Sequence, residues 1–262
     1  MRSVVIDKPG SVTVRDFPEP IPGRGEVVVD VRACGFCGTD LHIFRGEYLG
    51  EYPVRPGHES AGVVSAVGAD VGDLKVGDRV AIEPNIHCGT CAMCTSGRAN
   101  FCESWTAIGV TLPGCMAEKV VAPAGQVFKI GELSFEAGAF MEPLSCVLHG
   151  MKRIEPVTGA DVLIMGAGPI GLLILQVAKL RGARSVTLTD LRASRLELAK
   201  QLGADETVCA GTCGTAAPGC ADESDVTAEG GRATSRTAFD VVIDASGSVE
   251  AIRRTVDLAR PG

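Results

Sequence analysis

Four closely spaced cysteines carry the clearest chemical signal in the chain. They form two C-x2-C steps that share their central cysteine, and a fourth cysteine follows after seven residues: Cys88, Cys91, Cys94 and Cys102. Four thiolates at this spacing bind zinc tetrahedrally and leave no position open for a substrate. A disulfide cluster is the alternative, but the opening run MRSVVIDKPG lacks the pattern of a secretory leader. The spacing therefore predicts a structural zinc lobe at about residues 84–104.

A second set of metal ligands lies on either side of this lobe. Cys37 and His58 offer a thiolate and an imidazole, and Glu59 or Glu142 offers a carboxylate. Three such ligands make a catalytic zinc site, because the fourth position stays open for water or substrate. Taken singly, such residues are more often buried cysteines, packed histidines or paired charges. Their combination favours chemistry, although the residues alone do not rank Glu59 against Glu142.

A glycine-rich run between an expected strand and an expected helix predicts a dinucleotide site. The first glycine allows a tight turn, the second admits a pyrophosphate close to the backbone, and the third lets the helix pack on the strand. The candidate cofactor-binding residues in this run are Gly166, Gly168, Pro169, Ile170 and Gly171.

The next expected strand ends at Asp190, where an acidic residue can bind the ribose 2′-hydroxyl of the adenosine. A carboxylate there repels a 2′-phosphate, so NAD is favoured over NADP. Arg192 and Arg195 follow and could soften that choice. Each is more often a capping or solvated residue, and Arg195 is also a candidate for stacking on the adenine.

Two regions of different pattern must position these residues. Up to about residue 127, short β-branched runs alternate with glycine and proline, which predicts an irregular antiparallel β barrel with strands near 27–29, 62–67, 79–82 and 119–122. From about residue 161, strands alternate with amphipathic helices at 162–165 and 170–180, 186–189 and 192–202, and 241–243 and 249–258. This alternation predicts a doubly wound parallel sheet in the strand order 3-2-1-4, with residues 240–244 at its edge. Residues 140–156 bridge the regions, and the predicted domains are 1–150 and 151–262.

Composition narrows the function classes. The chain has 262 residues, 45% of them apolar and 22% charged, which is ample material for two packed domains. A net charge of -7 without any basic cluster argues against nucleic-acid partners. The longest apolar stretch, residues 162–178, is broken by glycines and a proline, so no membrane span is expected. We expect a cytoplasmic protein.

The remaining cysteines have simpler interpretations. Between Cys209 and Thr237 the chain is rich in Gly, Ala, Thr and Asp, and it lacks the apolar stripe of the helix expected there. Cys209, Cys213 and Cys220 lack a C-x2-C step, so an altered loop is favoured over a third metal site. Buried apolar positions are expected for Cys34, Cys115 and Cys146, and structural roles for His87 and His149.

The motifs, taken in order, resemble those of the zinc-dependent medium-chain dehydrogenase/reductase family. They are Cys37-Gly-Thr-Asp-Leu-His42, Pro56-Gly-His-Glu59, Gly77-Asp-Arg-Val80, the cysteine lobe, Glu142-Pro-Leu144 and the glycine run. Within the family they are similar to polyol and sorbitol dehydrogenases and to threonine dehydrogenase. The resemblance implies a GroES-like catalytic domain followed by a Rossmann domain, an active site in the cleft between them, and a homodimer or homotetramer.

The resemblance also implies roles for particular residues. It favours Glu59 as the third zinc ligand, with Glu142 as an exchanging ligand or as a holder of the zinc-bound water. We expect Thr39 to take the substrate's hydroxyl proton and pass it toward His42.

The predicted function is therefore hydride transfer from a secondary hydroxyl of a polyol or similar small alcohol to NAD, with catalytic and structural zinc. One alternative is L-threonine 3-dehydrogenase. The other is an inactive, truncated zinc-binding fragment, because family members continue past Gly262 with further Rossmann strands, so this domain is expected to be incomplete.

Overall fold

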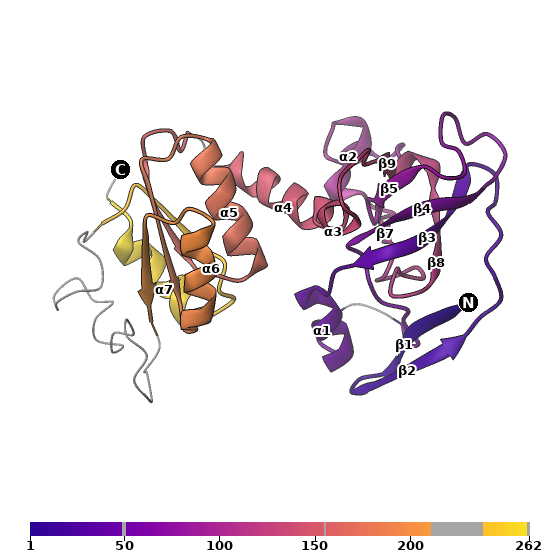
Figure 1. Cartoon of the computed structure of the whole chain (residues 1–262), viewed down its shortest axis with the longest axis horizontal. Coiled ribbons are helices and arrows are strands. Elements are labelled where there is room, and N and C mark those ends of the chain that lie inside the picture. The colour runs from indigo at the N-terminus through magenta and orange to yellow at the C-terminus, as the bar shows by residue number, and fades with distance from the viewer. Residues whose placement is uncertain (49–50, 155, 211–237, 261–262) are drawn as a thin grey trace. The chain divides into compact units, whose positions relative to one another are not determined.

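The computed structural model describes residues 1–48, 51–154, 156–210 and 238–260. The chain forms two compact units, Met1–Pro143 and Leu144–Gly262 (Figure 1). Each unit has its own apolar core. Helix α4 (Met141–Met151) begins in the first unit and continues into the second. The expected succession of a β-rich unit and a unit with a parallel sheet is confirmed.

The main sheet of the first unit is antiparallel and has the strand order β8-β3-β4-β5-β9. Its strands are β3 (Glu26–Cys34), β4 (Ser60–Val67), β5 (Arg79–Ile82), β8 (Lys119–Pro123) and β9 (Val127–Lys129). Val27, Val29, Val64 and Val80 are fully buried beneath this sheet because alternate β-branched residues face the core. Two smaller antiparallel sheets pair β1 (Arg2–Lys8) with β2 (Ser11–Asp16), and β6 (Asn85–Ile86) with β7 (Thr106–Ala107).

Short helices of the first unit begin or end next to several of the candidate ligands. Helix α1 (Gly38–Arg45) starts four residues after β3 and ends at Gly46, whose φ of 78° is in the left-handed region. Helix α2 (Ala92–Thr95) contains Cys94 of the lobe, the 3-10 turn η1 (Ala99–Phe101) ends directly before Cys102, and neither element contains a buried residue. The remaining short elements are η2 (Ala124–Gln126) and α3 (Phe135–Ala139).

The second unit has a parallel sheet in the order β12-β11-β10-β13. Its strands are β10 (Asp161–Met165), β11 (Ser185–Asp190), β12 (Glu206–Cys209) and β13 (Val241–Asp244), connected in part by α5 (Pro169–Leu180) and α6 (Ala193–Gln201) and followed by α7 (Val249–Leu258). All five residues of β10 are buried, as expected for a strand covered on both faces. The order 3-2-1-4 is confirmed.

The edge of this sheet has one feature that the sequence did not predict. Two residues before β13 begins, Phe239 pairs in parallel with Ala259. The Phe239 N–H donates to the Leu258 carbonyl at 2.9 Å, and the Arg260 N–H donates to the Phe239 carbonyl at 2.8 Å. The chain leaving α7 therefore returns alongside β13.

The outcomes for the remaining cysteines differ. Cys115 is buried and Cys34 is half-buried, but Cys146 is exposed, so its predicted burial is wrong. Val147 and Met151 lie on the buried face of helix α4, and Cys146 lies outside that face. Cys209 is buried at the end of β12, whereas Cys213, Cys220 and the rest of residues 211–237 lie outside the described residues. No helix in the described ranges is long and apolar enough to cross a membrane.

Candidate metal and dinucleotide sites

Three of the four candidate ligands of the catalytic zinc converge in the first unit. Cys37 is the residue that precedes α1, and His58 and Glu59 stand directly before β4. One ligand atom from each of these three side chains lies within 4.8 Å of the other two. A thiolate, an imidazole and a carboxylate at this separation suit a zinc ion with one open coordination position.

Asp40 holds two of the ligand-bearing segments together. Its carboxylate is almost fully buried and accepts the Cys37 N–H at 2.9 Å and the Gly57 N–H at 3.0 Å. Its Oδ1 atom is 3.6 Å from Nδ1 of His58, and that nitrogen is buried without a hydrogen-bond partner in the described residues. An imidazole held beside a carboxylate is a common arrangement for a zinc-binding histidine. Sequence reasoning missed Asp40, although an acidic residue three positions after Cys37 fits a capping pattern at a helix start.

The same neighbours determine the protonation of His58. Burial lowers the pKa of its imidazole, but the adjacent Asp40 and Cys37 outweigh that effect and raise the pKa to about 10. A zinc ion bound here therefore competes with a proton for His58.

The two candidate carboxylates occupy different places. Glu59 lies against Gly35, where a Cβ atom would come within 2.1 Å of Oε2 of Glu59, so this side chain needs a glycine opposite it. Glu59 also borders a hollow of about 190 Å³ together with Cys34, Glu136 and Phe140. Glu142 lies in the first turn of α4 and does not join the converging group of described residues.

The proposed proton-relay residues lie on α1. Thr39 is half-buried, and His42 follows three positions later, so both lie toward one side of the helix. Nδ1 of His42 is 2.8 Å from Oε2 of Glu47, and the Glu47 N–H donates to the His42 carbonyl at 2.9 Å. The turn at Gly46 thus ties Glu47 to His42 through both backbone and side chain.

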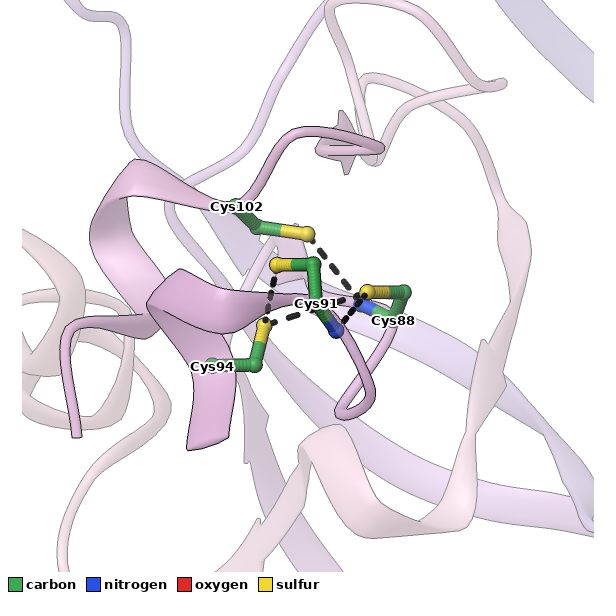
Figure 2. Close-up of side chains that lie close together, drawn as sticks. All are labelled: Cys88, Cys91, Cys94 and Cys102. Carbon is green, nitrogen blue, oxygen red and sulfur yellow. Dashed lines mark hydrogen bonds between the residues drawn. The ribbon is translucent and has the colours of Figure 1, made fainter. Parts of the chain in front are cut away.

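The four lobe cysteines point toward one another (Figure 2). The Sγ atoms of Cys91 and Cys94 are 3.5 Å apart, and those of Cys88 and Cys94 are 3.9 Å apart. A tetrahedral zinc with bonds of about 2.3 Å to sulfur places sulfurs about 3.8 Å apart, whereas a disulfide needs about 2.0 Å. The arrangement fits zinc, and none of the described cysteines is in a disulfide.

Hydrogen bonds in the lobe lower the pKa of the Cys88 thiol, whereas desolvation raises the pKa of the Cys94 thiol. The backbone N–H and the hydroxyl of Thr90 lower the pKa of Cys88 to about 6, because both stabilise a negative sulfur. The Cys88 N–H donates to Sγ of Cys102 at 3.3 Å, and the Cys91 N–H donates to Sγ of Cys88 at the same distance. Such donors orient sulfur ligands around a metal.

The glycine run joins β10 to α5 as expected. Gly166 has φ 104°, and a Cβ there would come within 2.7 Å of the Ala245 carbonyl oxygen. A Cβ on Gly171 would come within 1.9 Å of the Gly166 carbonyl oxygen, so this position must be small where helix and strand pack. A Cβ on Gly168 would meet no atom within 4 Å. That open space beside the backbone fits a pyrophosphate, and Pro169 and Ile170 next to it are exposed.

Asp190 ends β11, as predicted, and it is connected to the glycine run. Its Oδ2 accepts the Ala167 N–H at 2.8 Å, and its Oδ1 accepts the Arg192 N–H at 2.9 Å. Nη1 of Arg195 is 3.4 Å from Oδ2. The candidate ribose-binding carboxylate is thereby fixed relative to the candidate phosphate loop.

Fold and sites together define a zinc-binding oxidoreductase of the alcohol dehydrogenase type. The alcohol dehydrogenase GroES-like domain matches residues 23–132, and the zinc-binding dehydrogenase domain matches residues 169–262. The chain belongs to the zinc-dependent medium-chain dehydrogenase/reductase family, whose members use zinc and a nicotinamide dinucleotide.

Individual relatives agree with this assignment. The chain is 34% identical to D-arabinitol dehydrogenase 1 of Uromyces fabae, over all of this chain and 73% of the relative. It is 37% identical to L-threonine 3-dehydrogenase of Salmonella typhi, over 96% of this chain and 72% of the relative. Galactitol-1-phosphate dehydrogenase of Escherichia coli has a similar structure, with TM-score 0.85 and 34% identity over 100% of this chain and 73% of that one.

Proposed function

We propose that the protein transfers a hydride from a secondary hydroxyl of a small polyol to NAD. The convergence of Cys37, His58 and Glu59 carries this proposal, because these three side chains make an open zinc site in the first unit. Zinc bound there supplies a Lewis acid that lowers the pKa of a substrate hydroxyl.

The protein's own residues hold the site and move the proton. Asp40 fixes Cys37 through its N–H and restrains His58 through the neighbouring charge. The Thr39 hydroxyl takes the substrate proton, and His42, three residues further along α1, delivers it to solvent. Glu142, outside the converging group, is assigned no ligand role in this proposal.

The second unit binds the dinucleotide. Gly166, Gly168 and Gly171 form the turn into α5, with Pro169 and Ile170 at its start, and Asp190 binds the adenosine ribose. The buried carboxylate at the end of β11 favours NAD. Structures of relatives include an Escherichia coli CFT073 alcohol dehydrogenase with NADH and a Sinorhizobium meliloti 1021 protein with NADP, at TM-scores of 0.84 and 0.88.

Two relatives support the proposed substrate class and its alternative. D-arabinitol dehydrogenase 1 supports a polyol, and L-threonine 3-dehydrogenase supports threonine as the alternative. Both substrates carry a secondary hydroxyl, so the chemistry at the metal is the same. A panel of arabinitol, sorbitol, galactitol 1-phosphate and L-threonine, followed by NADH absorbance, distinguishes them.

The test of the site is Cys37→Ser, with Cys146→Ser as the matched control, since Cys146 is an exposed cysteine outside both metal clusters. Cys37→Ser should leave one tightly bound zinc instead of two and reduce turnover by at least a hundredfold, while the control keeps both zinc ions and full activity. Wild-type turnover by Cys37→Ser contradicts the proposed zinc site. One bound zinc ion, held in the lobe, without turnover on any substrate of the panel would support the inactive zinc-binding alternative.

A further inference from the structure

A hollow on the first unit uses none of the residues of the sites described above. It encloses about 460 Å³ between the segment that follows β2, the loop before β8, and β8 itself. None of its lining residues belongs to the converging zinc ligands, the cysteine lobe or the glycine run. Its volume is in the range of small-molecule sites in proteins.

The walls of this hollow are mostly apolar. They include the side chains of Phe17, Pro20, Ile86, Ile108 and Leu112. Ile108 is fully buried and Leu112 is 37% exposed, so the walls extend from the core to the surface. Such walls suit the apolar body of a ligand, because transfer of apolar surface out of water is favourable.

One cation in the wall, Arg55, has no partner for its charge. Its guanidinium lies over the ring of Phe17, with Cζ 4.8 Å from the ring centroid. Within the described ranges it makes no hydrogen bond and no ion pair. The side chain is half-buried, and burial lowers the pKa of the guanidinium, since no neighbouring anion offsets the loss of water. Arginine stays charged at neutral pH, so an anion that enters the hollow meets a positive charge already stacked in place.

The other charged side chains of the wall are already engaged. Nζ of Lys119 is 2.6 Å from Oδ1 of Asp30 and 3.7 Å from Oε2 of Glu19. Oε2 of Glu26 accepts a backbone N–H at 2.8 Å. The guanidinium of Arg55 is thus the charge that remains for a ligand, and one positive charge matches one negative charge.

A second hollow adjoins the first and shares Arg55, Leu112 and Pro113 with it. This second hollow encloses about 540 Å³, and Glu51 in its wall would repel an acid. Phe17, which holds the guanidinium, lines the first hollow and not the second. The first hollow is therefore the better site for an anion.

We propose that the first hollow binds a small monocarboxylic acid with an apolar body, its carboxylate on Arg55 and its body against the apolar walls. A guanidinium binds a carboxylate in a bidentate manner. A phosphate monoester has about two negative charges at pH 7 and would be repelled by Glu19 and Glu26, which also line the wall. The inference depends neither on hydride transfer nor on either zinc ion.

Calorimetric titration of the whole chain with three probes tests this site. The compound 3-phenylpropanoate has both the carboxylate and the apolar body, 3-phenylpropanamide lacks the charge, and propanoate lacks the ring. At pH 7 the protein should bind 3-phenylpropanoate at least tenfold more tightly than either of the other two. Arg55→Gln should weaken 3-phenylpropanoate about tenfold or more, as expected for the loss of a charge-assisted contact, and change 3-phenylpropanamide less than twofold.

Matched variants separate this contact from other causes. Arg24→Gln removes an arginine of the same unit that lies outside the hollow, and it should leave all three affinities unchanged. Leu112→Asp adds a carboxylate to the wall at an exposed position and should weaken 3-phenylpropanoate with Arg55 still present. Cys37→Ser should bind 3-phenylpropanoate as tightly as wild type does, which separates the hollow from the catalytic zinc, since carboxylates also bind zinc.

The outcomes that overturn the inference are distinct. Equal affinities of the wild-type protein for the acid and the amide would show that Arg55 does not receive a carboxylate. Unchanged binding of the acid in both Arg55→Gln and Leu112→Asp would place the acid elsewhere on the molecule. Loss of that binding in Cys37→Ser would assign the acid to the zinc site. None of these results bears on hydride transfer, which the turnover of Cys37→Ser tests separately.

Discussion

At the scale of single residues, Asp40 is the most consequential side chain that is not itself a candidate ligand. One buried carboxylate contacts the backbone of Cys37 and Gly57, which are twenty residues apart, and stands beside His58. Because it connects two ligand-bearing segments, its effect on metal binding should exceed its effect on folding.

Asp40→Asn tests this role. The amide offers one acceptor where the carboxylate offers two, and it removes the charge beside His58, so zinc affinity at this site should fall 10- to 100-fold. Zinc stoichiometry measured against a competing chelator should show one tight ion instead of two. Asp30→Asn serves as the control and should retain two. Unchanged affinity for both ions in Asp40→Asn would rule out the role.

A second residue-scale prediction concerns Asp30, which faces Lys119 across β3 and β8 with Nζ 2.6 Å from Oδ1. Burial raises the pKa of Asp30, but hydrogen bonds from Lys119 and Ser65 outweigh it and hold the pKa below its usual value. A lowered carboxyl pKa contributes stability that is present above the unfolded-state pKa, about 3.9, and is lost as pH falls through the folded-state value.

Asp30→Asn should therefore reduce the free energy of unfolding at pH 7 by about 0.5 to 1 kcal/mol, as expected for a partly exposed pair. The difference from wild type should be smaller at about pH 3 than at pH 7, because pH 3 lies below the unfolded-state pKa of about 3.9. Urea unfolding at both pH values measures it, with Asp73→Asn, an almost fully exposed position, as the control. A difference of the same size at both pH values would show that the ion pair is not its cause.

At the scale of elements, two glycines in the turn between β10 and α5 have different roles. One is needed for packing of the helix on the strand, and the other for binding of the dinucleotide. Gly171 lies against the Gly166 carbonyl, whereas Gly168 faces open space. Gly171→Ala should destabilise the second unit by about 1 to 3 kcal/mol through overpacking. Gly168→Ala should leave thermal unfolding almost unchanged and weaken adenosine diphosphate binding, because the added methyl fills the expected pyrophosphate position. Equal effects of the two substitutions on stability would contradict this division.

The elements also show how far sequence reasoning reaches. Strand and helix patterns such as Val162–Met165 and Val249–Leu258 depend on local periodicity, and the structure confirms them. The choice between Glu59 and Glu142 depends on which segment folds back toward Cys37, and local patterns carry no such information. Cys146 was misjudged because periodicity shows that a helix has an apolar face but not which borderline residues it covers. Asp40 was missed because its partner Gly57 is seventeen residues away.

At the scale of the whole molecule, the two units have separate cores. Loss of one zinc ion should therefore destabilise only the unit that binds it. In the lobe, α2 and η1 bury no side chain, and its order therefore depends on the four cysteines. Cys94→Ser should raise hydrogen exchange across residues 88–102 and lower the unfolding temperature of the first unit. Exchange in β10 and β11 of the second unit should stay unchanged. Protection of the lobe equal to that of wild type would mean that zinc is not what orders it.

The two backbone hydrogen bonds accepted by Asp40 also affect the rate at which a metal ion bound there exchanges. These hydrogen bonds hold Cys37 and the segment before His58 in place even without a metal ion. Binding of zinc therefore orders few additional atoms, and zinc can dissociate without local unfolding of the backbone. In the lobe, backbone N–H groups donate to the sulfur ligands themselves, and α2 and η1 bury no side chain, so release of its ion requires local unfolding, which is slower than dissociation from a preformed site. The two zinc ions should consequently exchange with isotopically labelled zinc at different rates, the ion beside Asp40 first.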